Sequence, residues 1–364
     1  MSALTIRPTT TAAEALESTD FPAENNGGLT SCRTIAVRSP SPGGGPEILL
    51  ARSTSLANLR GMSTYPAGGL TLEFLADPTA FLAAAGEHLA AEPVLSTVVT
   101  TVARRSVTRV EQGVPLPERD WWLVVRDARG TIVGAGMRTA PFVPYPMFLL
   151  PMPDEAAVGL ARALHERGEE TLGVNGALPA VRLCAAELAR LDGGKVEVQV
   201  HTRLFELGDL VPPAPVPGEL RQVRPDQVDL VQSWLEAFHH DADEQAGRPT
   251  DAASDEMPDR DETARRIESG NLWFWVDAAG VPVHVTGVTT PAFGVARIGP
   301  VYTPPAQRGN GWASAAVAEA SRRLQADGVR ACLFTDQANP TSNKIYTALG
   351  YRPVVDMANL RIAS

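Results

Sequence analysis

Hydrophobic positions in the first half of the chain form short runs with a two-residue period and longer runs with a helical period. Two apolar runs around the Asp-Ala-Arg-Gly segment at 127–130 have the pattern of a β-hairpin. Acidic residues at the start of 154–168 and a glycine at its end indicate a complete helix. The expected elements are a strand followed by helices over 70–105, a hairpin over 121–141, a helix over 154–168, a strand over 171–176, a helix over 177–194 and a strand over 195–207.

The second half shows the same kind of pattern from residue 220 onward. Strands that alternate with amphipathic helices predict an α/β (α+β) fold. The expected elements are a strand near 220–227, helices over 226–243 and 259–270, a hairpin over 272–290, a strand over 297–303, a helix that ends near Asp327, a strand over 331–336, and a short helix with a last strand over 337–354.

Composition divides the chain into regions. Residues 1–61 are rich in Thr, Ser, Pro, Gly and Ala and show no sustained period, so we expect a disordered, low-complexity tail. Met62 precedes the first patterned segment and is a second candidate for the start of the chain. The prolines of 212–217 predict a stiff, extended linker. These boundaries define a first domain over 62–211 and a second domain over 218–364.

The two halves are also similar to each other. Their hairpins align with a constant offset of 150, which places Asp127 on Asp277. The helices that follow align only with an offset of 160, which places Gly168 on Gly328. The second copy therefore has about ten extra residues in this interval, which contains the segment 304–313. The similarity indicates a diverged internal duplication.

Charge and cysteine usage exclude several classes of function. The chain of 364 residues has a net charge of −10, so the phosphate backbone of a nucleic acid would repel it. Cys32, Cys184 and Cys332 lie far apart without metal-ligand spacing, which favours reduced thiols in the cytoplasm. No apolar run reaches the roughly 18 residues of a membrane span, and the first residues lack a secretory-signal pattern.

A turn rich in glycine, at 304–313, joins an expected strand to an expected helix. Gly309 and Gly311 permit a positive φ and close approach to a ligand, and a helix N-terminus offers unpaired amides to an anion. A nucleotide P-loop requires Gly-Lys-Ser/Thr, whereas Trp312 and Ala313 follow Gly311 here. The dinucleotide fingerprint requires three spaced glycines and a later acidic residue, which are also missing.

The segment Arg-Gly-Asn-Gly-Trp-Ala at 308–313 resembles the acyl-CoA pyrophosphate loop, Arg/Gln-x-x-Gly-x-Gly/Ala, of the GNAT (GCN5-related) N-acetyltransferase superfamily. The prolines at 304–305 stand where two strands separate in that family. Residues 337–354 resemble the second motif of the family. The matching positions of this motif are Asn339, Tyr346, Gly350 and Tyr351. The resemblance covers about 218–364 and is strongest near the C-terminus.

The resemblance implies two tandem GNAT-like domains, each with a mixed, mostly antiparallel central sheet flanked by helices. It implies an enzyme that transfers an acetyl group directly from the co-substrate acetyl-CoA to a primary amine of a small molecule, without a metal. The residues that it assigns to the coenzyme are Val301, Tyr302, Thr303, Arg308, Gly309, Asn310, Gly311, Trp312, Ala313, Asn339 and Asn343.

By the same resemblance, Tyr346 matches the position that protonates the departing thiolate. An ordinary phenol pKa of about 10 lies close enough to that of a thiol for this transfer. The first half lacks the glycine turn and has no tyrosine in its later helix. It is therefore expected to be a degenerate copy that binds no coenzyme and has a structural role or shapes the acceptor cleft.

The sequence leaves the general base and the acceptor open. The base candidates are His239, His240, Glu244 and His284, and each of them equally suits a surface or core position. The acidic segment 239–262 lies where the family commonly lines its acceptor site, and it would attract a cationic amine or simply form a solvated loop. Alternatives within the enzymes are a mycothiol-synthase-like protein or a protein or peptide N-acetyltransferase. An alternative of another class is a non-catalytic acyl-CoA-binding sensor or scaffold.

Overall fold

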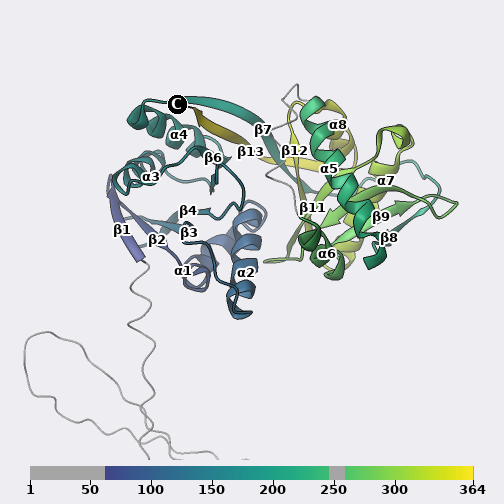
Figure 1. Cartoon of the computed structure of the whole chain (residues 1–364), viewed down its shortest axis with the longest axis horizontal. Helices are drawn as coiled ribbons and strands as arrows, with labels where there is room; N and C mark the ends of the chain where they lie inside the picture. The colour runs from purple at the N-terminus through teal and green to yellow at the C-terminus, as the bar shows by residue number, and fades with distance from the viewer. Residues whose placement is uncertain (1–61, 246–258, 364) are drawn as a thin grey trace, which may run out of the picture. The chain divides into compact units, whose positions relative to one another are not determined.

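The computed structural model describes residues 62–245 and 259–363 (Figure 1). The expected disordered tail at 1–61, Cys32 and part of the acidic segment lie outside the described residues. None of the helices in the described ranges combines the length and the apolar character that crossing a bilayer requires.

The first half follows the expected order of strands and helices. Asp77 caps the first helix by accepting a hydrogen bond from the Thr79 amide at 2.8 Å. Strands β1 and β5 were not expected, because β1 contains a proline and β5 has 3 residues, so neither gives a clear period. The elements are β1 (Met62–Ala67), β2 (Leu70–Leu75), α1 (Pro78–Ala91), α2 (Thr97–Glu111), β3 (Trp121–Arg126), β4 (Ile132–Arg138), β5 (Met147–Leu149), α3 (Asp154–Glu166), β6 (Gly173–Ala177), α4 (Ala180–Asp192) and β7 (Lys195–Leu207).

The second half has a similar order. Asp259 caps α6 by accepting from the Glu262 amide at 2.7 Å, as the sequence favours at a helix start. The last strand continues to Ala363, beyond the expected range. The elements are β8 (Glu219–Gln222), the 3₁₀ turn η2 (Pro225–Gln227), α5 (Val228–Gln245), α6 (Arg260–Glu268), β9 (Leu272–Val276), β10 (Pro282–Val288), β11 (Val295–Tyr302), the 3₁₀ turn η4 (Pro305–Gln307), α7 (Trp312–Ala326), β12 (Arg330–Asp336), α8 (Pro340–Ala348) and β13 (Tyr351–Ala363).

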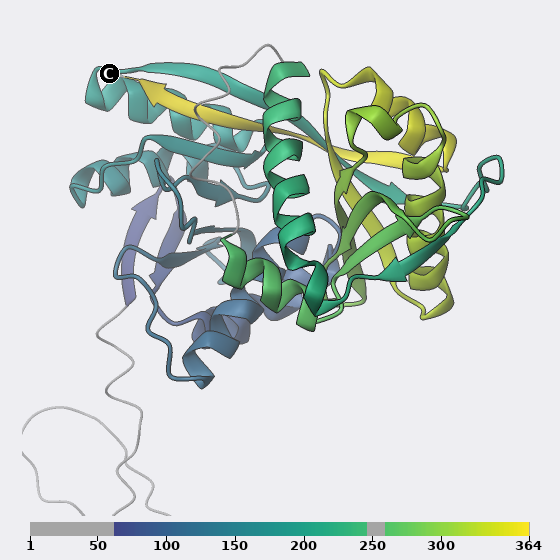
Figure 2. The ribbon, with the colours of Figure 1, turned by 45° about the vertical axis from the view of Figure 1, so that its right-hand side comes forward.

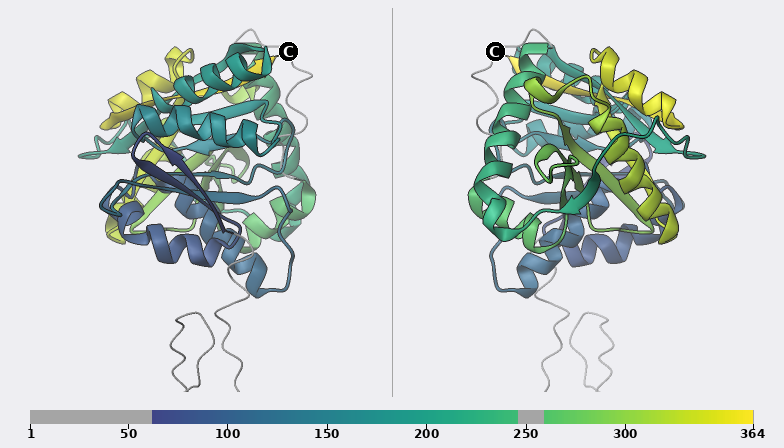
Figure 3. Two further views of the ribbon diagram at one scale, coloured as in Figure 1. Left: turned by 90° about the vertical axis from the view of Figure 1, so that its left-hand side faces the viewer. Right: turned by 90° about the vertical axis from the view of Figure 1, so that its right-hand side faces the viewer.

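One continuous sheet of 13 strands runs through the described residues, in the order β1-β2-β3-β4-β5-β6-β13-β7-β12-β11-β10-β9-β8. Neighbouring strands in this sheet are antiparallel, except for two parallel pairs, β5 with β6 and β11 with β12. In the first half, α3 and α4 pack on one face of the sheet, and α1 and α2 pack on the other (Figure 3). In the second half, α7 covers one face and α5 and α6 cover the other. The mixed, mostly antiparallel sheet with flanking helices is the fold class that the sequence predicted.

The last strand of each half pairs with the other half. Residues 202–206 of β7 pair antiparallel with 332–336 of β12, and residues 357–361 of β13 pair with 173–177 of β6. The two long strands also pair with each other, and both run from one half into the other (Figures 1 and 2). The proline-rich segment at 212–217 separates β7 from β8 in the sequence, but the sheet does not break between the halves.

Two hairpins show the internal similarity in detail. The Asp127 carboxylate accepts hydrogen bonds from the amides two and four residues later, at 2.9 and 2.8 Å. Asp277 makes the same two contacts, each at 2.9 Å. Gly130 and Gly280 close the two turns with φ of 82° and 80°. The halves diverge after these hairpins, because β5 has 3 residues and β11 has 8.

A separate apolar cluster holds the two halves together. Its members come from both halves and lie around the exchanged strands. They are Val94, Ala177, Leu204, Val295, Cys332 and Met357, all of which are buried. Each of the larger side chains among them (Val, Leu and Met) stabilises the folded state by about 1.5–3 kcal/mol before entropy is counted. The junction between the halves is therefore part of the core.

Candidate functional site

Strands β11 and β12 are neighbours for only part of their length. They pair in parallel over 295–297 of β11, and beyond that point the described partner of β11 is β10, at Val301 and Tyr302. Pro300 has no N–H group to give to a neighbouring strand, and it lies where the β10–β11 register is irregular. The backbone after Pro300 therefore has one edge without a strand partner in the described sheet.

The glycine loop leads from this strand end into α7. Gly309 and Gly311 have φ of 83° and 81°, and Gly311 is the N-cap residue of α7. Asn310 closes the turn by donating from its side-chain amide to the Gln307 carbonyl at 3.0 Å. Within the described ranges, no hydrogen-bond acceptor pairs with the backbone amides from Gly309 to Ser314. With the positive end of the α7 dipole, these amides form a cradle that suits an anion such as a pyrophosphate.

A cavity of about 590 Å³ joins the strand end to the glycine loop. Helices α5 and α8 and the end of β12 complete its lining. The residues assigned to the coenzyme from the sequence that line this cavity are Val301, Tyr302, Thr303, Arg308, Gly309, Asn310, Gly311, Trp312, Ala313 and Asn339. Asn343 is not in the lining. A volume of this size suits a small-molecule site.

Tyr346 lines the same cavity from α8. Its side chain is buried, and this burial raises the pKa of the phenol to about 12, so the group is protonated at neutral pH. Its ring packs edge-on against Tyr351 with the ring centroids 6.1 Å apart. The Tyr351 hydroxyl is hydrogen-bonded to Ser321 at 2.7 Å within the core. Ser342, which is hydrogen-bonded to the Tyr346 side chain, lines the cavity too. Of these two tyrosines, Tyr346 is the one that lines the cavity.

The two asparagines of the second motif hold the turn between β12 and α8. Asn339 caps α8 by accepting from the Ser342 amide at 3.1 Å, and it also lines the cavity. The Asn343 side-chain amide donates to the carbonyls of Asp336 and Asn339, at 3.1 and 2.7 Å. Asn343 therefore holds the turn and does not line the cavity, and the coenzyme role that the resemblance implied for it stays a prediction.

Helix α5 adds residues to the cavity that the sequence did not single out. Phe238 and Asp241 line it, and the Tyr302 hydroxyl donates to the Asp241 carboxylate at 3.1 Å. Burial, and then the hydrogen bond to Asp241, raise the pKa of Tyr302 to about 12. Arg308 donates to the same carboxylate and to the Thr303 carbonyl, the latter at 3.0 Å. The carboxylate thus ties α5 to both the strand end and the start of the loop.

The base candidates fall in different places. His284 is buried on β10, where its Nδ1 lies 2.8 Å from the Thr303 hydroxyl. Burial lowers the pKa of His284 to about 3, so the ring is neutral, and its Nε2 has no partner in the described part of the chain. His240 is exposed near the end of α5. His239 and Glu244 also belong to α5, but their side chains lie outside what is described. Neither His240 nor His284 lines the cavity.

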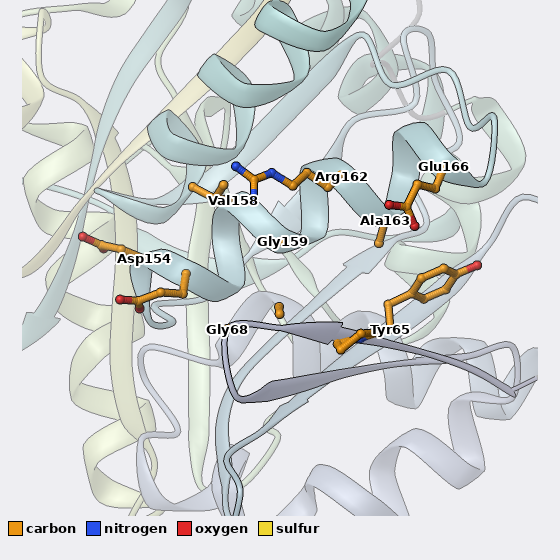
Figure 4. A pocket seen from close by; sticks show the side chains of 11 residues that line it. Tyr65, Gly68, Asp154, Val158, Gly159, Arg162, Ala163 and Glu166 are labelled. Atoms are coloured by element: carbon orange, nitrogen blue, oxygen red, sulfur yellow. The ribbon is translucent and has the colours of Figure 1, made fainter.

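The corresponding helix of the first half, α3, begins differently. Pro153 is its N-cap residue, and Asp154 and Glu155 occupy its first turn. A second cavity, of about 450 Å³, lies between α3 and the β1–β2 hairpin (Figure 4). Carboxylates at a helix N-terminus offset the partial charge that would hold a phosphate, and Glu166 adds another to this lining. The lack of coenzyme binding in this half stays a prediction.

The described lining of the cavity contains neither a metal-binding group nor a thiol. No group of three or more His, Cys, Asp or Glu side chains there is arranged to hold a metal ion. Cys184 and Cys332 are free and buried in the core. Burial raises the pKa of the Cys332 thiol to about 11 and raises that of Cys184 as well.

Comparisons with known proteins relate these features to a family. Residues 285–361, which contain the strand end, the glycine loop and Tyr346, match the family model described as FR47-like protein. No curated protein matches the sequence. The structure is similar to that of a Drosophila protein with a TM-score of 0.54, 14% identity, and coverage of 80% of this chain and 98% of the other, which is a likeness of fold.

Two further structures carry family names. One is a tandem GNAT protein from the clavulanic acid biosynthesis pathway, with a TM-score of 0.39, 18% identity, and coverage of 68% of this chain and 84% of the other. The other is a GCN5-related N-acetyltransferase from Sphaerobacter thermophilus, with a TM-score of 0.46 and 19% identity. The likeness covers 71% of this chain and 84% of the other. The segment 285–361, which matches the FR47-like model, thus contains both motifs by which the sequence resembles the GNAT superfamily of N-acetyltransferases.

Proposed function

We propose that this protein is an N-acetyltransferase that transfers an acetyl group from acetyl-CoA to a primary amine of a small molecule. One observation carries the proposal. A single cavity brings together the strand end at 301–303, the unpaired amides of the glycine loop and the protonated phenol of Tyr346. These are the groups needed to hold an anionic coenzyme, to polarise a thioester and to protonate a leaving thiolate.

The residues present fit the coenzyme by charge and by space. The loop amides and the α7 dipole suit its pyrophosphate, and a Cβ built on Gly309 would meet no heavy atom within 4 Å, so the cradle is open at this point. The free backbone edge at Val301 and Thr303 supplies hydrogen-bonding groups for the amide-bearing arm and the thioester carbonyl. A donor at that carbonyl would stabilise negative charge as it develops on the oxygen.

The proposed reaction is direct acyl transfer. The lone pair of a neutral amine attacks the thioester carbon and forms the new C–N bond while the C=O electrons move to the oxygen. When these electrons return, the C–S bond breaks, and the sulfur takes a proton from Tyr346. The amine nitrogen loses one proton to a base or a water chain, and the phenolate of Tyr346 is reprotonated from solvent.

The pKa of Tyr346 is compatible with this step. At about 12 the phenol keeps its proton until the thiolate forms. The same burial that raises the phenol pKa also destabilises a thiolate in the cavity, so the pKa values of the two groups rise together. Among the described residues that line the cavity, Tyr346 is the group that best suits this role.

A thiol-release assay tests the proposal. Acetyl-CoA is incubated with the protein and a panel of primary amines, and free CoA is measured with a thiol reagent. We expect turnover with at least one small amine and a loss of roughly 100-fold or more in kcat for Tyr346→Phe, within the range for general acid catalysis. Undiminished turnover by this variant would refute the general-acid role. Tight binding of acetyl-CoA without turnover across the panel would favour a sensor instead.

The location of the protein belongs to the same proposal. We place it in the cytoplasm because Cys184 and Cys332 are free thiols and because acetyl-CoA is an intracellular metabolite.

A further inference from the structure

A carboxylate that the proposed reaction does not use lines the coenzyme cavity. The Asp241 side chain, near the C-terminal end of α5, is 19% exposed. Tyr302 and Arg308 both donate to its Oδ2 atom. The contact of Oδ1 is His240 Nδ1 at 3.8 Å, which is beyond hydrogen-bond distance. Among the described residues, one oxygen of Asp241 is therefore open to another donor, and the nearby C-terminus of α5 favours a cationic one.

The position of Arg308 is the second observation. Its Nε donates to the Thr303 carbonyl at 3.0 Å and a terminal nitrogen donates to Asp241, so the guanidinium lies on the α5 side of the loop. Its centre also lies 5.9 Å from the centroid of the Tyr302 ring. A guanidinium binds phosphate oxygens through paired, charge-assisted hydrogen bonds. A pyrophosphate on the loop amides would thus compete with Asp241 for Arg308.

We propose that Asp241 selects an acceptor with a cationic group, and that coenzyme binding makes Asp241 available by drawing Arg308 toward the phosphates. This inference rests on the proposed function. When Arg308 leaves, the partly buried Asp241 carboxylate keeps the hydrogen bond from Tyr302 but loses its ion-pair partner. The carboxylate is then destabilised until another cation takes the place of Arg308. Coenzyme and acceptor then strengthen each other's binding, because each favours the separated state of Asp241 and Arg308.

The chemistry narrows the acceptor class further. The reacting nitrogen must be neutral to attack the thioester, whereas a carboxylate holds a nitrogen in its protonated form. Asp241 therefore contacts a second cationic group of the acceptor. The class of substrate is a small diamine, or another amine that carries a separate positive charge.

A purely structural role for Asp241 makes the opposite prediction. If the ion pair serves only to fix α5 against the loop, then Asp241→Asn loosens the loop and weakens coenzyme binding. If Asp241 competes with the phosphates, the same variant frees Arg308 and removes a repelling charge, so coenzyme binds more tightly. Glu236→Gln is the matched control, because it removes one negative charge from an exposed site on the same helix, outside the cavity.

Calorimetric titration with CoA separates these outcomes. We expect CoA to bind Asp241→Asn about two- to fivefold more tightly than the wild type, as the strength of a partly exposed ion pair allows, with no change for Glu236→Gln. Arg308→Gln should weaken CoA binding more in the Asp241→Asn background than in the wild type, because the arginine is no longer shared. Weaker or unchanged CoA binding by Asp241→Asn would overturn the inference.

Turnover tests the acceptor side with two probes of equal length, 1,5-diaminopentane and pentylamine. With acetyl-CoA, the wild type and Glu236→Gln should prefer the diamine by roughly tenfold in kcat/KM, and Asp241→Asn should lose this preference. The same preference in all three proteins would contradict the role of Asp241. If the wild type neither binds CoA nor releases thiol with any amine, the proposed function fails. If it turns over amines without a charge preference, the inference fails alone.

Discussion

Gly309→Ala tests whether the glycine loop holds the coenzyme. Gly309 has φ of 83°, and an added Cβ would meet no heavy atom within 4 Å. The substitution therefore causes no clash, and its cost in the free protein is that of a left-handed alanine, about 1–2 kcal/mol in the free energy of unfolding. The methyl group would stand where the coenzyme approaches the backbone, so we expect CoA affinity to fall about tenfold or more, which is about 1.4 kcal/mol.

Gly328→Ala provides the matched control. Gly328 follows the other end of α7 with φ of 70°, and a Cβ there also meets nothing within 4 Å. Both variants should lose similar stability in urea titrations, whereas only Gly309→Ala should lose CoA affinity by calorimetry. Wild-type affinity in Gly309→Ala, with the shared loss of stability present, would refute the assignment of the loop.

Further predictions concern pH, folding and the second motif. Burial lowers the pKa of His284 to about 3, below the value of about 6.5 in the unfolded chain, so the unfolded state alone binds this proton between those values. The free energy of unfolding should therefore decrease by up to about 1.4 kcal/mol per pH unit below 6.5, and this slope should shrink in His284→Gln; an unchanged slope in this variant would contradict the argument. Residues 62–217 and 218–363, produced separately, should each lack cooperative unfolding by circular dichroism, because β7 and β13 complete each other's sheets; a cooperative transition in either piece alone would contradict this. Asn343→Ala should lower the free energy of unfolding by about 1–3 kcal/mol because it removes two side-chain hydrogen bonds that hold the turn. CoA affinity should change less than threefold, and a larger loss of affinity would support the ligand role.

Local signals explain why much of the fold was predictable. The Asp-x-x-Gly turns at 127–130 and 277–280 carry their own hydrogen bonds, so their geometry depends little on the rest of the chain. Most helices likewise begin and end close to the capping residues and glycines that the sequence shows. The short strand β5 has no such signal, because four apolar residues between prolines define no period.

The exchange of β7 and β13 was beyond sequence reasoning. Each of these strands has 13 residues, but alternation along a strand does not reveal its neighbours. The choice between β6 and β12 as a partner depends on contacts between residues more than a hundred positions apart. The linker at 212–217 was visible in the composition, yet the pairing across it was not.

Some residues of the candidate site were likewise predictable from local sequence, whereas the roles of others depend on tertiary contacts. The glycine loop and Tyr346 follow a local motif, and the structure brings them to one cavity. Asn343 matches the same motif, but its side chain turns toward backbone carbonyls, and spacing alone does not reveal this. Asp241 was hidden in the acidic segment 239–262, where nothing in the sequence separates it from its neighbours; only its contacts with Tyr302 and Arg308 do.

A crystal structure of the protein with CoA tests the central claim most directly. We predict that the pyrophosphate accepts hydrogen bonds from the amides between Gly309 and Ala313, and that the sulfur lies within reach of the Tyr346 hydroxyl. Arg308 should then contact a phosphate rather than Asp241. Coenzyme bound elsewhere, such as in the cavity beside α3 in the first half, would contradict the account.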